Sequence, residues 1–271
     1  IGFYEFIKKL DKNFDSNAEL LVKQLVRAQM CIFRKENLTL SLTGEFNFKS
    51  LLEGEMLQFN RMLYEMPCVK AVPTFNMEKK NEGFKTASKV QYVASGGCFE
   101  KEGQEYTGAL KVLKTIFSYD YLWVNVRVTG GAYGCMCSFS RNGYGFFTSY
   151  RDPNLSATLD VYKKAAEYVR NFEAGQRDMT KYIIGTISGI DQPLEPAALG
   201  DRSFHAYQSG VTVEMIQKER NQVLDATEET IRSLAGYIET MMDAGTVCAI
   251  GNDRKLEEEK ELFEQVSSLT Q

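Results

Sequence analysis

Residues 121–154, YLWVNVRVTGGAYGCMCSFSRNGYGFFTSYRDPN, decide how the second part of this chain folds. The stretch contains the only tryptophan of the chain, an adjacent Gly-Gly pair and a Tyr-Arg-Asp-Pro-Asn segment. Aromatic residues, an arginine and paired glycines this close together are typical of a backbone that bends sharply while it presents a few polar side chains. The simplest structural interpretation is a helix or strand followed by a β-hairpin inside an ordinary core.

The first third of this stretch carries conflicting local signals. Val124, Val126 and Val128 alternate with polar residues, as they would in a strand, whereas Gly130 and Gly131 would equally end a helix. The rest is clearer, because an Arg-Asn-Gly turn separates two short runs of β-forming residues, and Asn-Gly tolerates the positive φ of a tight turn. We therefore expect a hairpin with strands at 135–140 and 144–150.

The remainder of the second part alternates helical and extended patterns. Helical spacing of apolar residues predicts helices, and short runs of β-forming residues predict strands. The helices are expected at residues 106–119, 155–172, 177–188, 202–209, from 212 onward, 225–243 and 253–269, and further strands at 85–99 and 246–250. These elements predict an α+β fold, with helices packed on a mainly antiparallel sheet.

The first part of the chain is shorter and incomplete in pattern. Apolar spacing predicts two helices in residues 1–33 and one in 48–65, and the alternation in NLTLSLTGEF predicts a strand at 37–46. A single strand leaves its backbone groups unpaired, and the first residue is Ile1, so we expect the chain to begin inside a longer gene product. Residues 67–84 follow neither period, which predicts an end of a preceding α+β domain at 1–78 and a carboxyl-terminal domain at 79–271.

The composition excludes several classes of partner. The chain has 271 residues, 44% hydrophobic and 25% charged, with a formal net charge of -4. Lysines and glutamates are interspersed, so no basic stripe is present for nucleic acid. No apolar run approaches the roughly 18 residues of a membrane span, and no signal sequence opens the chain. We expect no nucleic-acid partner and no membrane insertion.

The cysteines and the single histidine do not predict a metal site. Six cysteines lie among apolar neighbours without the C-x2-C spacing of a zinc site, which is typical of reduced thiols in an intracellular protein. Cys135 and Cys137 would share one face of a strand, but a metal needs further ligands and His205 is the only histidine of the chain. We expect no metal in this chain and a cytoplasmic location.

Motifs of complete hydrolase or nucleotide sites are absent from the sequence. It contains no H-x-x-E-H or H-x-x-E-x-x-H, no G-x-S-x-G, no P-loop and no G-x-G-x-x-G. The GGAYG segment could be interpreted as a phosphate-binding loop, but it contains no lysine and follows no clear buried strand.

Three segments carry a family resemblance: VRVTGGAYG, SYRDPNLSATLDVY, and TVCAIG with the charged residues after it. Together they resemble the carboxyl-terminal half of pitrilysin/insulinase-type zinc metallopeptidases, on the presequence-protease branch, over most of residues 85–271. Residues 1–66 resemble the end of the preceding domain with less distinctive motifs. The resemblance implies one half of a clamshell that closes around an unfolded peptide, with the zinc site, H-x-x-E-H, in an amino-terminal half that this chain lacks.

The resemblance also implies the site residues. An arginine and, six residues later, a tyrosine of the family match Arg127 and Tyr133, and residues 121–128 match a helix that ends at the diglycine. A phenol and a guanidinium aimed at a reacting peptide carbonyl stabilise its developing negative charge. Gly130, Gly131 and Ala132 would contact the substrate between them. Without the resemblance, Arg127 would be interpreted as a surface ion pair and Tyr133 as a core ring.

The segment after the hairpin has a supporting role in this interpretation. Tyr150, Arg151 and Asp152 are expected to fix the turn between hairpin and helix, with Asn154 as a candidate N-cap.

Three functions remain open from the sequence. The first is the substrate-binding carboxyl-terminal part of a zinc metalloendopeptidase that degrades unfolded oligopeptides, inactive without its amino-terminal half. The second is a noncatalytic structural or interaction subunit of the same superfamily. The third is a small-molecule binding protein that uses the glycine-rich segment. Whether the chain belongs to an enzyme thus depends on a zinc motif outside it.

Overall fold

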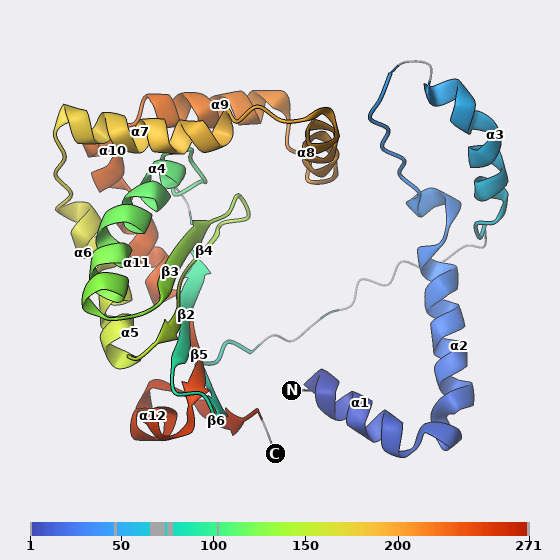
Figure 1. Ribbon diagram of the computed structural model, residues 1–271, viewed down its shortest axis with the longest axis horizontal. Coiled ribbons are helices and arrows are strands. Elements are labelled where there is room, and N and C mark those ends of the chain that lie inside the picture. The colour runs from blue at the N-terminus through green and yellow to red at the C-terminus, as the bar shows by residue number, and fades with distance from the viewer. Residues whose placement is uncertain (1, 46–47, 66–73, 75–77, 102, 270–271) are drawn as a thin grey trace. The chain divides into compact units, whose positions relative to one another are not determined.

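The computed structural model describes residues 2–45, 48–65, 74, 78–101 and 103–269 of the chain (Figure 1). Contacts within the chain divide it into two compact units. One comprises Ile1–Asn76 and Pro193–Gly210, and the other comprises Met77–Gln192 and Val211–Gln271. The predicted boundary segment 67–84 lies partly outside the described residues, and the division into domains at 1–78 and 79–271 stays a prediction.

The first unit is helical where it is described. The two helices predicted in residues 1–33 are confirmed, and the helix predicted at 48–65 ends slightly earlier than expected. The elements are α1 (Gly2–Lys12), α2 (Phe14–Ile32), the 3-10 turn η1 (Lys35–Asn37), α3 (Phe48–Arg61) and α8 (Pro196–Gln208). Proline at the start of α8 suits a position whose N–H has no partner within the helix.

The strand predicted at 37–46 is wrong over the residues described. Residues 38–45 form no strand, and Leu38, Leu40 and Leu42 are all exposed. The only isolated bridge among the described residues, Arg34 with Tyr64, lies outside this run. Alternation fits a strand geometrically, but a strand forms only where a partner takes up its backbone groups.

The second unit is built on one six-stranded sheet. Its strands are β1 (Glu82–Thr86), β2 (Gln91–Cys98), β3 (Gly134–Phe139), β4 (Tyr144–Asp152), β5 (Thr246–Asn252) and β6 (Gln265–Ser268). They lie in the order β3-β4-β2-β5-β1-β6. The pairs from β3 to β5 are antiparallel, and β1 pairs parallel with both β5 and β6. The α+β fold with a mainly antiparallel sheet is confirmed.

Helices of the second unit gather on one side of this sheet (Figure 1). They are α4 (Ala109–Ile116), α5 (Ser156–Lys163), α6 (Ala165–Arg170), α7 (Gln176–Ile190), α9 (Val213–Leu224), α10 (Glu228–Ser233), α11 (Ala235–Asp243) and α12 (Asp253–Glu258). In α9, Thr212 accepts a hydrogen bond from the backbone N–H of Met215, as an N-cap does. No helix in the described part of the chain is both long and apolar enough to span a membrane.

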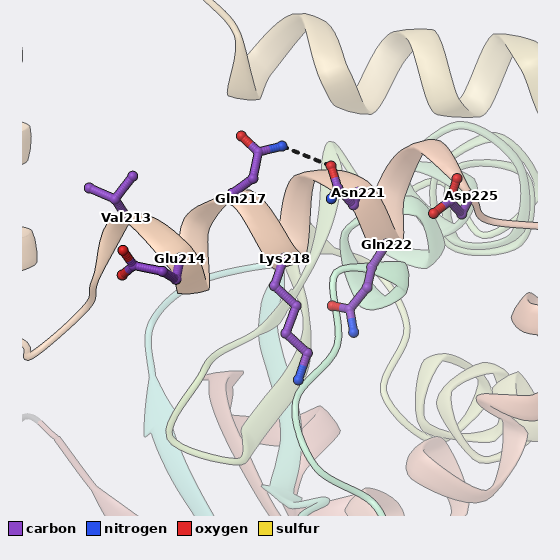
Figure 2. Close-up of a pocket in the computed structure, with 7 residues that line it drawn as sticks. All are labelled: Val213, Glu214, Gln217, Lys218, Asn221, Gln222 and Asp225. Carbon is purple, nitrogen blue, oxygen red and sulfur yellow. Dashed lines mark hydrogen bonds between the residues drawn. The ribbon is translucent and has the colours of Figure 1, made fainter.

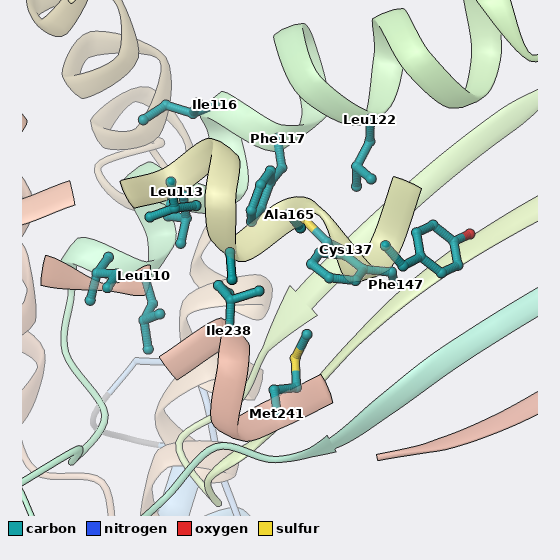
Figure 3. Close-up of a cluster of buried hydrophobic side chains, with 14 of the residues drawn as sticks. Leu110, Leu113, Ile116, Phe117, Leu122, Cys137, Phe147, Ala165, Ile238 and Met241 are labelled. Carbon is teal, nitrogen blue, oxygen red and sulfur yellow. The ribbon is translucent and has the colours of Figure 1, made fainter. Parts of the chain in front are cut away.

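The core lies between these helices and the sheet (Figure 3). Phe117 and Phe147 meet edge to face there, with ring centroids 5.4 Å apart, a geometry that aromatic pairs favour. Further fully buried side chains come from α4, α11 and the hairpin, among them Leu110, Leu113, Ile116 and Ile238. This core fixes the hairpin against the helix that precedes it.

Two predictions at the ends of the sheet need correction. The single strand expected at 85–99 is two strands, β1 and β2, separated by a turn. The helix expected at 253–269 ends at Glu258, and QVSS at Gln265–Ser268 forms β6, paired with β1. The charged residues of 253–261 obscure the short strand that follows, because a four-residue strand is too short to show a clear period.

Candidate functional site

One unbroken run of helical residues leads to the candidate site. It begins with α4 and continues through two π-helical segments, Phe117–Tyr121 and Trp123–Thr129. π-helical turns are rare and often occur at functional sites. The helix at 121–128 that the family resemblance implied is therefore present, in π form, rather than the strand that the valine alternation favoured.

Burial explains why the alternating valines do not make a strand here. A strand would place Val124, Val126 and Val128 on one face. In the helix, Leu122 and Val126 are buried, whereas Val124 and Val128 are exposed. The apolar spacing that matters is therefore i to i+4, which continues the buried face of α4.

Arg127 is held against an aromatic ring of the same helix. Its guanidinium carbon lies 3.9 Å from the centroid of the Trp123 ring, four residues earlier. A cation over an aromatic face is attracted by the ring and loses less freedom when it binds a second group. The Arg127 side chain is thus partly ordered by Trp123.

The diglycine ends the helix and turns the chain. Gly131 has a φ of 81°, a left-handed value, and its N–H donates to the carbonyl of Arg127 at 2.9 Å. The N–H of Ala132 donates to the carbonyl of Val126 at 3.1 Å. Ala132 is only 3% exposed, so any contact with a peptide would come from its backbone.

Tyr133 leaves this turn as an exposed ring. It is 59% exposed, and its ring lies edge to face with that of Tyr150, with centroids 5.4 Å apart. The next residue, Gly134, is covered by Tyr150, because a Cβ at Gly134 would lie 2.2 Å from Cε1 of that ring. The Tyr133 ring therefore packs against the Tyr150 ring and remains largely exposed.

Arg151 is a bulged residue beside Tyr133. In the pairing of β2 with β4, Gln91 is opposite Asp152 and Tyr92 is opposite Tyr150, so Arg151 has no partner across the ladder. Its φ is 49°, the one positive value among the described non-glycine residues. Its carbonyl accepts from the N–H of Tyr133 at 3.4 Å, and its guanidinium carbon lies 5.4 Å from the Tyr133 ring centroid. Bulges often redirect a side chain next to an active site.

Buried polar groups brace the turn that follows. Asp152 is fully buried and accepts from the N–H of Asn154 at 2.9 Å and from the Thr158 hydroxyl at 2.7 Å. The Gln91 side chain donates to the carbonyl of Pro153 at 3.1 Å. The predicted turn-fixing role of Asp152 thus agrees with its contacts.

Asn154 differs from its predicted role as an N-cap. The N-cap position of α5 is Leu155, and the N–H of Ser156 donates instead to the Glu259 carboxylate at 2.8 Å. The Asn154 amide donates to the carbonyl of Gly130, which links the hairpin's end to the diglycine turn.

The charged side chains of this site are placed to donate hydrogen bonds. Neither Arg127 nor Arg151 forms an ion pair with another residue that the structure describes, so both guanidiniums can receive an anion or a carbonyl oxygen. The predicted pair and Arg151 are all hydrogen-bond donors. No carboxylate or histidine among the described contacts of Tyr133 could act as a base.

A metal does not fit the described residues. They contain no group of three or more histidine, cysteine, aspartate or glutamate side chains placed to hold an ion. Burial raises the pKa of Cys135 to about 11 and that of Cys137 to about 12, while the charges of Arg127 and Lys114 respectively act in the opposite direction. Cys68 lies outside the described residues.

Two concave surfaces in the described part of the chain are lined by neither Arg127 nor Tyr133. One lies along α9 and is lined by Val213, Glu214, Gln217, Lys218, Asn221, Gln222 and Asp225 (Figure 2). All seven belong to one helix or its end, and Gln217 donates to Asn221 at 2.8 Å, so the surface resembles a solvated helix face. Another groove runs between Tyr121 and Asn125 of the π-helical run and the α5–α6 pair.

Comparison with known proteins assigns this architecture to a family. The family model described as the PreP C-terminal domain matches residues 81–253, which include the whole site described above. The chain belongs to the PreP C-terminal domain family. Its predicted place in the carboxyl-terminal half of the insulinase-type metallopeptidases, on the presequence-protease branch, is confirmed.

Relatives of this PreP C-terminal domain are much longer proteins. Protein HypA of Clostridium perfringens is 38% identical over 99% of this chain and 27% of its own length. Presequence protease 1 of Arabidopsis thaliana, chloroplastic and mitochondrial, is 30% identical over 93% of this chain and 24% of its own length. The chain therefore spans about a quarter of these relatives.

Solved structures share the fold at low identity. A peptidase M16 inactive domain from Pseudomonas fluorescens superposes with a TM-score of 0.55 at 14% identity, covering 80% of this chain and 52% of that one. A protease from Helicobacter pylori gives 0.52 at 16% identity, covering 73% and 52%. These likenesses concern the fold alone.

Sequence reasoning missed three contributors to the site. The Trp123–Arg127 contact follows from i, i+4 spacing, but only after the segment is accepted as helical. The bulge at Arg151 has no sequence signal, since arginine is not a residue that favours positive φ. Asn154 was singled out as a cap, and its true partner, Gly130, is 24 residues away.

Proposed function

We propose that this chain is the substrate-binding carboxyl-terminal part of a zinc-dependent metalloendopeptidase that degrades unfolded oligopeptides, and that it is inactive without the amino-terminal half. The observation that carries the proposal is the exposed phenol of Tyr133 on a braced turn. The unpaired guanidinium of Arg127 lies at the other end of that turn.

The chemistry of the proposal follows from these two donors. Attack on a peptide carbonyl turns its oxygen into an oxyanion, and donors aimed at that position stabilise it more than they stabilise the substrate. The Tyr133 hydroxyl would donate to that oxygen or to a neighbouring carbonyl. The Arg127 guanidinium, held on Trp123, would balance the negative charge with little loss of freedom.

The metal and the location are parts of the same proposal. Because the described residues assemble no metal site, zinc would be held by an H-x-x-E-H motif in the amino-terminal half, where it would activate the attacking water. We also propose an intracellular location, which is supported by the free thiols of Cys98, Cys135, Cys137 and Cys248.

Substitution of Tyr133 tests the proposed role. The chain is combined with the amino-terminal half of the natural protein, and cleavage of an unstructured peptide is followed. Tyr133→Phe removes one hydroxyl and should lower kcat about a hundredfold, equivalent to about 3 kcal/mol of transition-state stabilisation. Tyr119→Phe is the control, since Tyr119 is 70% exposed and lies outside the site.

The outcomes separate the peptidase function from the noncatalytic subunit. Equal turnover for Tyr133→Phe and the unsubstituted protein would reject the assigned role. An assembled protein that cleaves no peptide, with an amino-terminal half that lacks H-x-x-E-H, would instead favour a noncatalytic subunit.

A further inference from the structure

Strand β3 lies at one edge of the sheet and begins directly after Tyr133. It pairs with β4 along its whole length, from Gly134 opposite Tyr150 to Phe139 opposite Gly145. No other described strand pairs with it. One row of its backbone N–H and C=O groups is therefore left without a strand partner.

This edge has none of the usual protection against pairing. Edge strands are normally blunted by charged side chains, proline, bulges or shortness. The sequence of β3, GCMCSF, contains no charge and no proline, and its register with β4 is unbroken. By contrast, the strand at the opposite edge, β6, is only four residues long.

The sheet face next to this edge is apolar and exposed. Met136 on β3 is 55% exposed, and Phe146 on β4 is 43% exposed. Both lie on one face, because Ser138 is paired with Phe146 and Met136 is two residues from Ser138. Farther along the same face, Tyr92 is 47% exposed and is paired with Tyr150.

We propose that the free edge of β3 binds an extended peptide as an additional strand, with apolar side chains of the peptide at alternate positions over Met136 and Phe146. Backbone pairing would supply affinity without fixing sequence, and the apolar face would select aromatic or aliphatic side chains. Because β3 starts at Gly134, the added strand runs beside the Tyr133 phenol. The inference rests on the proposed function for its choice of ligand, a peptide.

The occupant is a peptide rather than a second copy of this chain for a reason of position. An edge that adjoins an exposed phenol and two unpaired guanidiniums combines backbone pairing with donors for further carbonyl oxygens. A symmetric β3-to-β3 contact between two copies would be antiparallel and would leave the guanidiniums of the two copies at opposite ends of the paired strands, so self-pairing would not use these donors together.

N-methylated peptides test the added strand directly. The probe is a short peptide with phenylalanine at alternate positions and serine between, added to the 271-residue chain. Two further versions carry N-methyl groups on all phenylalanines or on all serines. Neighbouring N–H groups of a strand point to opposite edges, so only one of these two sets faces β3. One version should bind about tenfold more weakly or worse, since several hydrogen bonds are lost, and the other should bind as the parent does.

Amide hydrogen exchange locates the site. Binding of the parent peptide should slow exchange within residues 135–139, and the weakened version should not. Equal binding by both N-methylated peptides, protection confined to other strands, or no binding at millimolar peptide would overturn the proposal. Concentration-dependent dimers that lose β3 protection on dilution without peptide would overturn it in favour of self-pairing.

A charge on the edge strand gives an independent check. Met136→Lys should weaken the parent peptide about tenfold, because lysine on an edge strand opposes pairing. Met215→Lys on α9 is the matched control, since Met215 is 43% exposed and remote in sequence from the sheet. If Met136→Lys does not fold, the N-methyl comparison still decides on the unsubstituted chain.

These measurements do not depend on cleavage. If Tyr133→Phe leaves turnover unchanged and a peptide still binds at β3, the proposed function is rejected and the peptide site at β3 is retained. Loss of turnover in Tyr133→Phe without any effect of N-methylation would leave the proposed function and reject the site.

Discussion

The side-chain amide of Asn154 donates a hydrogen bond to the carbonyl of Gly130. This bond joins the segment after β4 to the diglycine turn, although 24 residues separate them. Gly130 needs to lack a side chain here, because a Cβ would lie 2.5 Å from the Val126 carbonyl oxygen. The position of Tyr133 is therefore set from two sides, by the helix before it and by the hairpin after it.

Asn154→Ala should loosen that turn. Loss of the Asn154 amide leaves the Gly130 carbonyl without its side-chain donor. The free energy of unfolding, measured by urea denaturation, should therefore fall by about 1 to 2 kcal/mol. Turnover by the assembled protein should fall as well, because Tyr133 loses one of its supports. Asn171→Ala, at the exposed end of α6, is the control and should change stability by less than about 0.5 kcal/mol. Equal stabilities for the two variants would contradict the bracing role.

Arg151 offers a test of stored backbone strain. A non-glycine residue in the left-handed region costs about 1 to 2 kcal/mol, and glycine avoids that cost. With φ at 49°, Arg151→Gly should be more stable than Arg151→Ala by about 1 kcal/mol, because both lose the guanidinium and only alanine keeps the strain. Urea unfolding of the two variants measures this difference. If the Arg151→Ala variant were as stable as the Arg151→Gly variant, the backbone at the bulge would not be strained.

The sequence predicted the hairpin and the core helices because each depends on local signals. Asn-Gly sets the turn between β3 and β4, and apolar spacing places the buried face of α4. The helical conformation of residues 121–129 was predicted only from the family resemblance. The local pattern does not show that Val126 is buried and Val128 exposed, because the whole core decides this. The bulge at Arg151 and the long-range bond of Asn154 depend on tertiary contacts that no local pattern encodes.

The membership of the family was predictable for the same reason as the hairpin. VRVTGGAYG and SYRDPN are each a continuous stretch of sequence. In the structure they are linked by the hydrogen bond from Asn154 to Gly130. The missed strand β6 and the wrong strand at 37–46 show the opposite case. A strand exists only with a partner, and its partner is chosen by the fold rather than by its own sequence.

Glu219 on α9 links α9 to α4 and to the hairpin turn through two ion pairs. It is 7% exposed and forms ion pairs with Lys111 of α4 at 2.9 Å and with Arg141 of the hairpin turn, whose second nitrogen donates at 2.9 Å. Burial raises the pKa of its carboxyl, but hydrogen bonds and charge from Arg141 and Lys111 together outweigh burial and hold the pKa below its ordinary 4.5.

The sign of the pH effect follows from that depressed pKa. The folded state binds the Glu219 proton less tightly than the unfolded state, so the carboxylate contributes stability above about pH 4.5. That contribution is lost as the pH falls through the lower folded pKa. Glu219→Gln cannot titrate, so its deficit relative to the unsubstituted chain should shrink as the pH falls below 4.5.

At neutral pH, Glu219→Gln should cost about 1 to 3 kcal/mol, because two cations lose their buried partner while Arg141 and Lys111 keep some access to water. Glu239→Gln is the control: Glu239 pairs with Arg170 where both side chains are about half exposed, and exposed pairs contribute little. Urea unfolding from pH 7 toward pH 3 measures both variants. A deficit for Glu219→Gln that stays constant over this range would show that the carboxylate charge is not what joins α4, α9 and the hairpin.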